Sequence, residues 1–139
     1  MNLRIDKRWI TDSISEEALS QISSFSKSLT EDRDNRDFSS LKSSQIRKFY
    51  GEVKRIQTNG IEKNKDAFKM LKPKLAYAVG RQSRQDKEKV DRFYQTISQA
   101  IDAVQIDQME DSKELNHRFK NFVNLFEAIV AYHKYHGGE

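Results

Sequence analysis

The sequence has no cysteine, a single proline and five glycines among its 139 residues. The absence of cysteine excludes disulfides, thiolate nucleophiles, thiolate zinc sites and cysteine-ligated iron–sulfur clusters. No stretch approaches the ~18 apolar residues that indicate a membrane span, and the start of the chain leads into no apolar segment typical of signal peptides. We therefore expect a soluble, cytoplasmic protein that binds no membrane.

Motifs of the common enzyme classes are also missing. There is no glycine-rich phosphate loop, no G-x-S-x-G elbow and no H-E-x-x-H pair. His133 and His136 could share a helix face as metal ligands, but no carboxylate cluster accompanies them, which favours a structural or surface role. The acidic runs at 31–34 and 110–111 fall in expected loops, where solvated side chains or helix caps are a better interpretation than a two-metal site. These absences favour a protein without a metal or cofactor, and leave an enzyme, such as a metal-dependent nuclease, as the third and least favoured function.

Apolar residues recur at helical spacing over nearly the whole chain, and no segment alternates as a strand does. About 100–200 residues usually make one domain. The sequence therefore predicts an all-α fold, a compact bundle of about five helices in a single domain, residues 1–139. The phenylalanines at 119, 122 and 126 are expected in its core, because they lie at helical spacing.

Capping and helix-breaking residues set the expected helix ends. Pro73 lies inside a helical pattern, so we expect a break there, with Pro73 at the first position of a new helix. Gly80 also lies inside that pattern, so either something approaches it closely or the helix ends nearby. The other limits, in chain order, are a capping box at 13–16, a cap at Ser39 or Ser40, a stop at Asn59-Gly60, a start near Asp86, a capping box at 111–114 and a stop at Gly137-Gly138.

Residues 1–38 are expected to form a loosely packed N-terminal segment before a helical core at 39–138. Serines at 20–28 weaken the first helix, and the charged stretch 30–37 indicates a solvated loop. Trp9 precedes the first helix among basic residues, where it either latches the segment to the core or anchors a neighbouring subunit.

The charge is unevenly distributed along the chain. The formal net charge is only +4, but residues 40–90 hold 14 Lys/Arg and 5 Asp/Glu (net +9), and the remainder holds 11 and 16 (net −5). Clustered cations create a local field that the total charge does not report. A basic middle between acidic flanks therefore points to a polyanionic partner.

Two cationic stripes appear when the middle segment is placed on helices at about 100° per residue. A single stripe is most often only a solvated helix face, but two on neighbouring helices favour a nucleic-acid surface. Such a surface would neutralise phosphates with little sequence preference. The Tyr77 ring would either stack on an unpaired base or lie in the core. The stripes comprise Arg47, Lys48, Lys54 and Arg55, then Lys74, Tyr77, Arg81 and Arg84, with Lys63, Lys65, Lys69 and Lys72 between them.

Three segments resemble, in the same order, the small subunit of type III-A CRISPR interference complexes, the Csm small subunit. They are Ser44-Gln45-Ile46-Arg47-Lys48-Phe49-Tyr50, Lys72-Pro73-Lys74-Leu75-Ala76-Tyr77-Ala78-Val79-Gly80-Arg81, and the stretch from Phe122-Val123 through Phe126 to Tyr135. The resemblance covers about residues 39–138. No motif before Ser39 can be matched.

The resemblance implies an all-helical, non-catalytic subunit that stacks in several copies along a ribonucleoprotein filament, beside the guide RNA and its paired target RNA. It would contact the RNA backbone, other subunits of the Csm complex and its own copies, and cleavage would belong to other subunits. The residues that it places at or near RNA are Arg47, Lys48, Lys72, Lys74, Tyr77 and Arg81. Lys54, Arg55 and Arg84 follow from helical geometry alone. The alternative is a helical protein-interaction module whose basic face binds acidic partner subunits without touching RNA.

Overall fold

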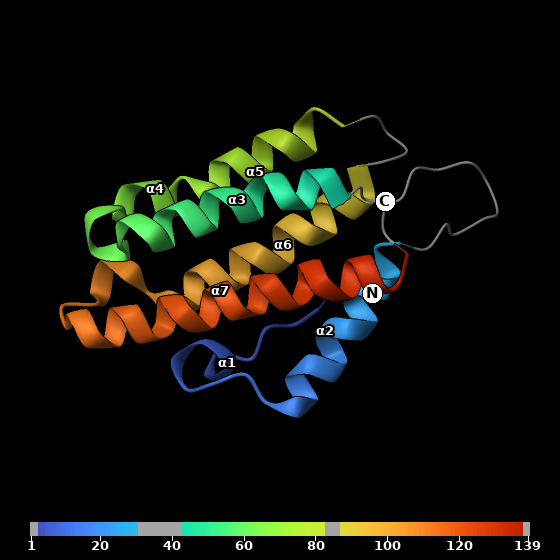
Figure 1. Cartoon of the computed structure of the whole chain (residues 1–139). Helices are drawn as coiled ribbons and strands as arrows, with labels where there is room; N and C mark the ends of the chain where they lie inside the picture. Colours follow the sequence, from blue (N-terminus) through green and yellow to red (C-terminus); the bar gives the residue numbers. More distant parts are fainter. Residues whose placement is uncertain (1–2, 31–42, 83–86, 138–139) are drawn as a thin grey trace.

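Helices are the only regular elements in residues 3–30, 43–82 and 87–137, the ranges that the computed structural model describes (Figure 1). Five of these helices have ten residues or more, so the expected all-α bundle of about five helices is confirmed. In chain order the elements are α1 (Arg8–Thr11), α2 (Glu16–Ser28), α3 (Ser43–Asn59), the 3₁₀ turn η1 (Ile61–Lys63), α4 (Lys65–Lys69), α5 (Leu71–Gly80), α6 (Lys87–Val104), the 3₁₀ turn η2 (Ile106–Gln108) and α7 (Ser112–Tyr135).

The long C-terminal helix α7 is the centre of the bundle. It contacts α1 and α2 on one side, α3 on another and α6 along its length, and α5 packs on α6 (Figure 1). The described helices therefore form three tiers, with α3 to α5 above the α6–α7 pair and α1 and α2 below it. None of the helices in the described ranges is long and apolar enough to cross a membrane.

Aromatic rings fill the space between α4, α6 and α7. Phe68 of α4 meets Phe119 and Phe122 edge to face, with ring centroids 5.6 and 5.1 Å apart. Phe93 of α6 meets Phe126 in the same way at 5.6 Å. All five rings are buried, so the core position expected for the α7 phenylalanines is confirmed. Because edge-to-face pairs add to the gain from burial, Phe68 anchors the five-residue α4 to α7.

A carboxylate of η1 reinforces this end of the bundle. The Ser112 hydroxyl and the Asn116 amide both donate to Glu62, at 2.7 and 2.9 Å. These two hydrogen bonds stabilise the ionised form and hold the pKa of Glu62 below its usual value. The connection after α3 is therefore fastened to the first turn of α7.

The helix ends agree with the sequence signals, with local shifts. Ser15, two residues after the first position of the expected capping box, caps α2 by accepting from the Ala18 N–H at 3.1 Å. Asp111 caps α7 by accepting from the Lys113 N–H at 3.0 Å. Gly60 and Gly137 follow α3 and α7 with φ of +93° and +99°, a region that glycine adopts without strain. Residues 39–42 and 83–86, with the expected helix starts at Ser39, Ser40 and Asp86, lie outside the described ranges.

The expected helix start at Pro73 is wrong by two residues. The break falls at Met70, α5 begins at Leu71, and Pro73 is its third residue. A proline in the first turn costs no hydrogen bond, because the first N–H groups of a helix have no intrahelical acceptor. The helix ends at Gly80, which decides between the two explanations of that glycine, and nothing lies within 4 Å of a Cβ built there.

The expectation of a loosely packed N-terminal segment is wrong for residues 3–29. Leu3, Trp9, Ile10 and the inner face of α2 are all buried, and Trp9 retains only 6% exposure. Trp9 therefore latches the segment to the core of its own chain. Residues 31–38 lie outside the described ranges.

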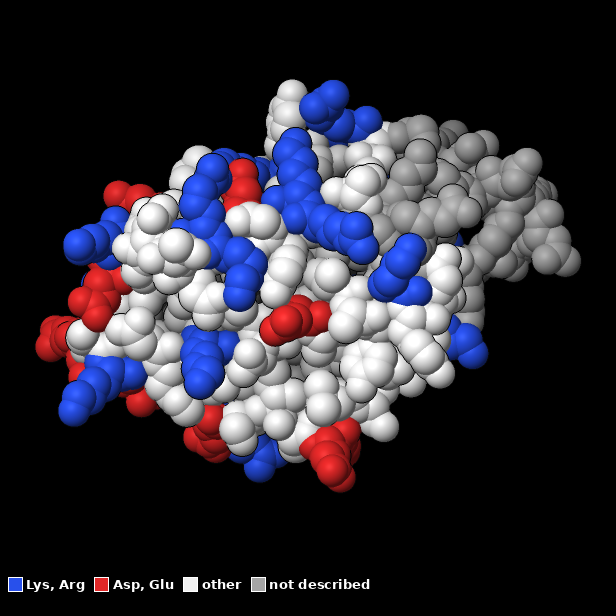
Figure 2. Space-filling view, viewed as in Figure 1, with Lys and Arg blue, Asp and Glu red and all other residues white. Residues whose placement is uncertain are grey.

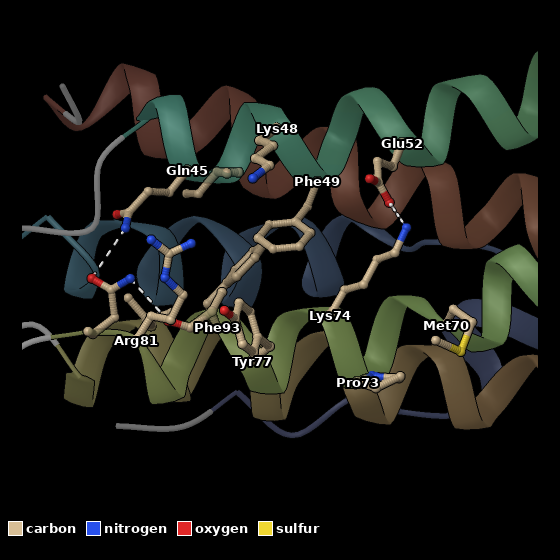
Figure 3. A pocket seen from close by; sticks show the side chains of 14 residues that line it. Gln45, Lys48, Phe49, Glu52, Met70, Pro73, Lys74, Tyr77, Arg81 and Phe93 are labelled. Atoms are coloured by element: carbon tan, nitrogen blue, oxygen red, sulfur yellow. Dashed lines mark hydrogen bonds and ion pairs between the residues drawn. The ribbon is translucent and has the colours of Figure 1, made fainter.

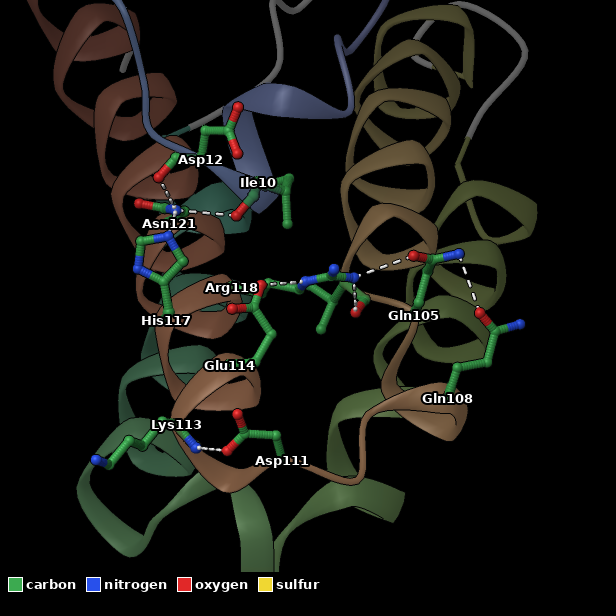
Figure 4. Close-up of polar contacts among 11 residues, drawn as sticks. Ile10, Asp12, Gln105, Gln108, Asp111, Lys113, Glu114, His117, Arg118 and Asn121 are labelled. Carbon is green, nitrogen blue, oxygen red and sulfur yellow. Dashed lines mark hydrogen bonds and ion pairs between the residues drawn. The ribbon is translucent and has the colours of Figure 1, made fainter.

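Side-chain amides fix the backbone of this segment. Asn121 of α7 donates through Nδ2 to the carbonyls of Ile10 and Asp12, at 2.9 and 3.1 Å (Figure 4). Gln99 of α6 accepts from the Ile5 N–H at 2.9 Å and donates to the Leu3 carbonyl at 3.2 Å. Because irregular backbone must find partners when it is buried, these two amides explain why the segment can pack so closely.

The turn between α6 and α7 is held in a similar way. Gln105 has a left-handed φ of +55°, unusual for a residue other than glycine. Its side chain donates to Gln108 and accepts from Arg118 of α7, both at 3.0 Å (Figure 4). Arg118 also binds Glu114 at 2.9 Å, so one guanidinium joins the turn to α7.

Candidate nucleic-acid interface

A groove of about 640 Å³ separates α3 from α5 (Figure 3). It follows from how the two helices are supported, since α3 packs on α7 and α5 packs on α6. Val90 and Phe93 of α6 close the bottom, and Ile46 and Phe49 of α3 form the adjoining wall. The groove is thus apolar at depth and open toward solvent.

The opposite wall is a second apolar face of α5. Leu71, Leu75 and Val79 point into the core. Met70, Pro73 and Tyr77, at spacings of three and four, line the groove instead. Tyr77 is 68% exposed, so its alternative placement in the core is wrong.

Cationic side chains stand along the rim. Lys48 comes from α3, Lys74 comes from α5, and Arg81 is the residue directly after α5 (Figure 3). The Arg81 guanidinium lies 5.7 Å from the centre of the Tyr77 ring, a cation–π distance. In the described part of the chain, neither Lys48 nor Arg81 has a carboxylate within ion-pair distance. Their charges are therefore directed to solvent or to a ligand.

Two polar contacts bridge the groove. Lys74 Nζ pairs with Glu52 across it at 3.2 Å. Toward the C-terminal end of α5, Gln45 donates to Gln82 at 3.4 Å, and Gln82 donates to the Ala78 carbonyl at 3.1 Å (Figure 3). Among the described residues that line the groove, Glu52 is the only carboxylate, so three cations face one anion.

The stripe expected on α3 divides into two rows. Lys48 and Arg55 are seven residues apart and form one row, on the side toward α4 and α5. Arg47 and Lys54 form the other row, about 100° around the helix. All four are exposed, as expected from the sequence. Arg55 lies 3.7 Å from Glu52, and Lys54 binds Gln57 at 2.8 Å and lies 6.0 Å from the Tyr50 ring.

Tyr50 closes the far side of α3 against α7. Its ring packs on Phe126 at 5.7 Å. Burial raises the pKa of the Tyr50 hydroxyl, and the neighbouring Glu127 carboxylate raises it further. Tyr50 is therefore a neutral packing residue beside the Arg47 row.

Lysines at the other edge of α4 and α5 turn away from the groove. Lys72 pairs with Asp102 of α6 at 2.6 Å. Lys69 pairs with Asp107 of η2, and this contact raises the pKa of Lys69. Lys72 is thus not brought together with Lys48, Lys74, Tyr77 and Arg81. Arg84 lies outside the described ranges.

Charged side chains are unevenly distributed on the face drawn in Figure 2. Lys and Arg gather over α3, α4 and α5, whereas charged side chains are sparse over α2 and the adjoining part of α7. The sequence indicated the cations but not the groove between them. The spacing of Met70, Pro73 and Tyr77 was a usable signal, because it marks apolar residues on α5 outside its core stripe.

The histidines do not form a shared site. His133 is buried, and His136 exchanges a 2.9 Å hydrogen bond with Ser23 of α2. Among the residues that the structure describes, no three or more His, Asp or Glu side chains are grouped to hold a metal ion.

Fold and site together define a small all-helical protein with a cation-rimmed apolar groove. The family described as Csm2 Type III-A matches residues 16–139, nearly the whole chain. The chain therefore belongs to this family and is a small subunit of a type III-A Csm complex. The match includes α2, for which the sequence motifs showed no resemblance. No curated protein and no solved structure matches the chain.

Proposed function

We propose that this subunit binds the RNA of the complex through the exposed cations of α3 and α5. It is a non-catalytic, cytoplasmic component of antiviral defence that lies along the guide RNA and its paired target RNA. Several copies stack along the RNA and contact one another and other Csm subunits. The contacts are made to the backbone, so binding has little sequence preference.

The observation that carries this proposal is the set of cations without acidic partners on one side of the bundle. Lys48 and Arg81 face each other across the groove, and Arg47 is exposed one residue before Lys48. Two neighbouring lysines are neutralised within the chain, Lys72 by Asp102 and Lys69 by Asp107. A phosphate backbone supplies the regularly spaced anions that such a surface lacks.

The test is RNA affinity of the purified full chain over a salt series, for the wild type and for the double variant Arg47→Ala with Arg81→Ala. Each phosphate contact adds about 0.7–0.9 to the slope of log affinity against log salt. We expect the double variant to bind more weakly at low salt and to lose about 1.4–1.8 from the slope.

The matched control is Lys113→Ala with Lys120→Ala, which removes the same charge from exposed positions on α7 outside the groove. We expect it to keep most of the slope. An unchanged slope in the Arg47/Arg81 variant would exclude the proposed surface. Binding of acidic Csm subunits by a wild-type chain that binds no RNA would favour the protein-interaction module instead.

A further inference from the structure

We infer that the groove between α3 and α5 binds an unpaired nucleobase, stacked on Tyr77, when the subunit holds single-stranded RNA. This inference rests on the proposed function and adds to it a ligand group that backbone binding does not require. Phosphates need only an exposed cationic surface. The apolar depth of this groove, lined by Ile46, Phe49, Val90 and Phe93, has no role in such binding.

The dimensions and lining of the groove suit a flat, mostly apolar group. Its volume of about 640 Å³ falls within the 300–1,000 Å³ range of small-ligand sites. The side chains at its base come from α3 and α6, which are held in the packed core. Two contacts, Lys74 to Glu52 and Gln45 to Gln82, join the two walls.

The rim offers a stacking platform. The Tyr77 ring is 68% exposed at the groove, although most large apolar rings of this chain are buried. The Arg81 guanidinium, 5.7 Å from the ring centre, adds a second planar group at the C-terminal cap of the same helix. Unpaired bases stack on aromatic rings and guanidinium planes in single-strand binding sites, and this stacking is tolerant of sequence.

The charges favour RNA over an acidic protein segment. Glu52 is already engaged by Lys74, which leaves Lys48 and Arg81 at the rim for anions. A nucleotide supplies both a flat base for the groove and a phosphate for the rim. An acidic segment supplies the anion, but Asp and Glu have no planar apolar group to fill the groove. A paired A-form helix presents phosphates and 2′-hydroxyls but keeps its base faces stacked inside, so it cannot enter.

The experiment compares three RNA probes with the full chain at one salt concentration. They are a single strand, the same strand carrying abasic nucleotides, and the same strand paired with its complement. The abasic strand retains every phosphate but loses the bases. We expect the wild type to bind the single strand about 5- to 150-fold more tightly than the abasic strand, from the range of base–aromatic stacking energies.

Tyr77→Ala should abolish this preference while leaving binding of the duplex and of the abasic strand unchanged. Tyr77→Phe should retain the preference, because it keeps the ring. The matched control is Tyr135→Ala, since Tyr135 is an even more exposed tyrosine, at 80%, on α7 and outside the groove. It should behave as the wild type does.

The failures of the two proposals are distinguishable. If Tyr77→Ala weakens binding to all three probes equally, or to none, the nucleobase site is wrong while RNA binding by the cationic surface stands. Equal wild-type affinity for the intact and abasic strands leads to the same conclusion. If no probe binds the wild type, the proposed function itself fails. An acidic peptide can be tested as a competitor of the single strand. If the peptide displaces the strand from the wild type and binds the Tyr77→Ala variant more weakly, the groove belongs to a protein partner.

Discussion

At the residue scale, single polar side chains decide where irregular backbone can be buried. Asn121 is 7% exposed, and its one Nδ2 group serves two carbonyls of the N-terminal segment. Gln99 donates to the Leu3 carbonyl and accepts from the Ile5 N–H of the same segment. No pattern in the sequence distinguishes these amides from the exposed Asn124, because their partners lie about a hundred residues away in the chain.

The first prediction concerns Asn121. Asn121→Ala leaves the Ile10 and Asp12 carbonyls without their shared donor and should lower the free energy of unfolding by about 1–3 kcal/mol. Denaturant unfolding followed by circular dichroism measures this change. Asn124→Ala, an exposed position on the same helix, should change stability by less than about 0.5 kcal/mol. Equal losses in the two variants would contradict a role for the hydrogen bonds.

At the scale of elements, α5 and the turn before it show how local rules and tertiary context combine. The break near Pro73 followed from the chemistry of proline, and the stop after α3 followed from Gly60. The start of α5 at Leu71 follows the short helix α4, which Phe68 packs against α7. Ring packing over such distances is not visible in a local pattern.

The second prediction compares two glycines on or beside α3. Gly51 lies in the helix interior, is exposed and has nothing within 4 Å of a built Cβ, so Gly51→Ala should raise the free energy of unfolding by about 0.5–1 kcal/mol. Gly60 has φ of +93°, so Gly60→Ala should lower it by about 1–3 kcal/mol through backbone strain. Thermal unfolding of both variants is the measurement. Two shifts of the same sign would contradict the difference in backbone conformation between Gly51 and Gly60.

At the scale of the whole molecule, the N-terminal segment and the helical bundle share one core. Trp9, the only tryptophan, is buried with Ile10 in a cluster that extends to α6 and α7. The N-terminal segment should therefore unfold together with the rest of the bundle.

The third prediction uses Trp9 as a local probe. Its fluorescence and the helical circular dichroism of the whole chain should change at the same denaturant midpoint, as in a cooperative two-state transition. A tryptophan transition at clearly lower denaturant would mean that the segment detaches before the bundle unfolds. That result would restore the loose packing expected from the serine-rich sequence.

The same scale explains the candidate site. The positions of the cations on α3 and α5 were predictable from the sequence, and all the described ones are accessible. Their roles were not, because Lys72 is neutralised by Asp102, which is 30 residues away, and Lys74 by Glu52, which is 22 residues away. The groove exists because α3 and α5 pack on different helices.

The sequence by itself determined the helical class, the buried stripes, most helix ends and the cationic middle segment. These features depend on spacing within one helix, on caps and on local charge, all of which act over a few residues. Only the tertiary structure decided that residues 3–29 are tightly packed, that the α3 stripe forms two rows and that Tyr77 faces an apolar groove. Those features depend on side chains far apart in the chain, which are brought together only when the helices pack.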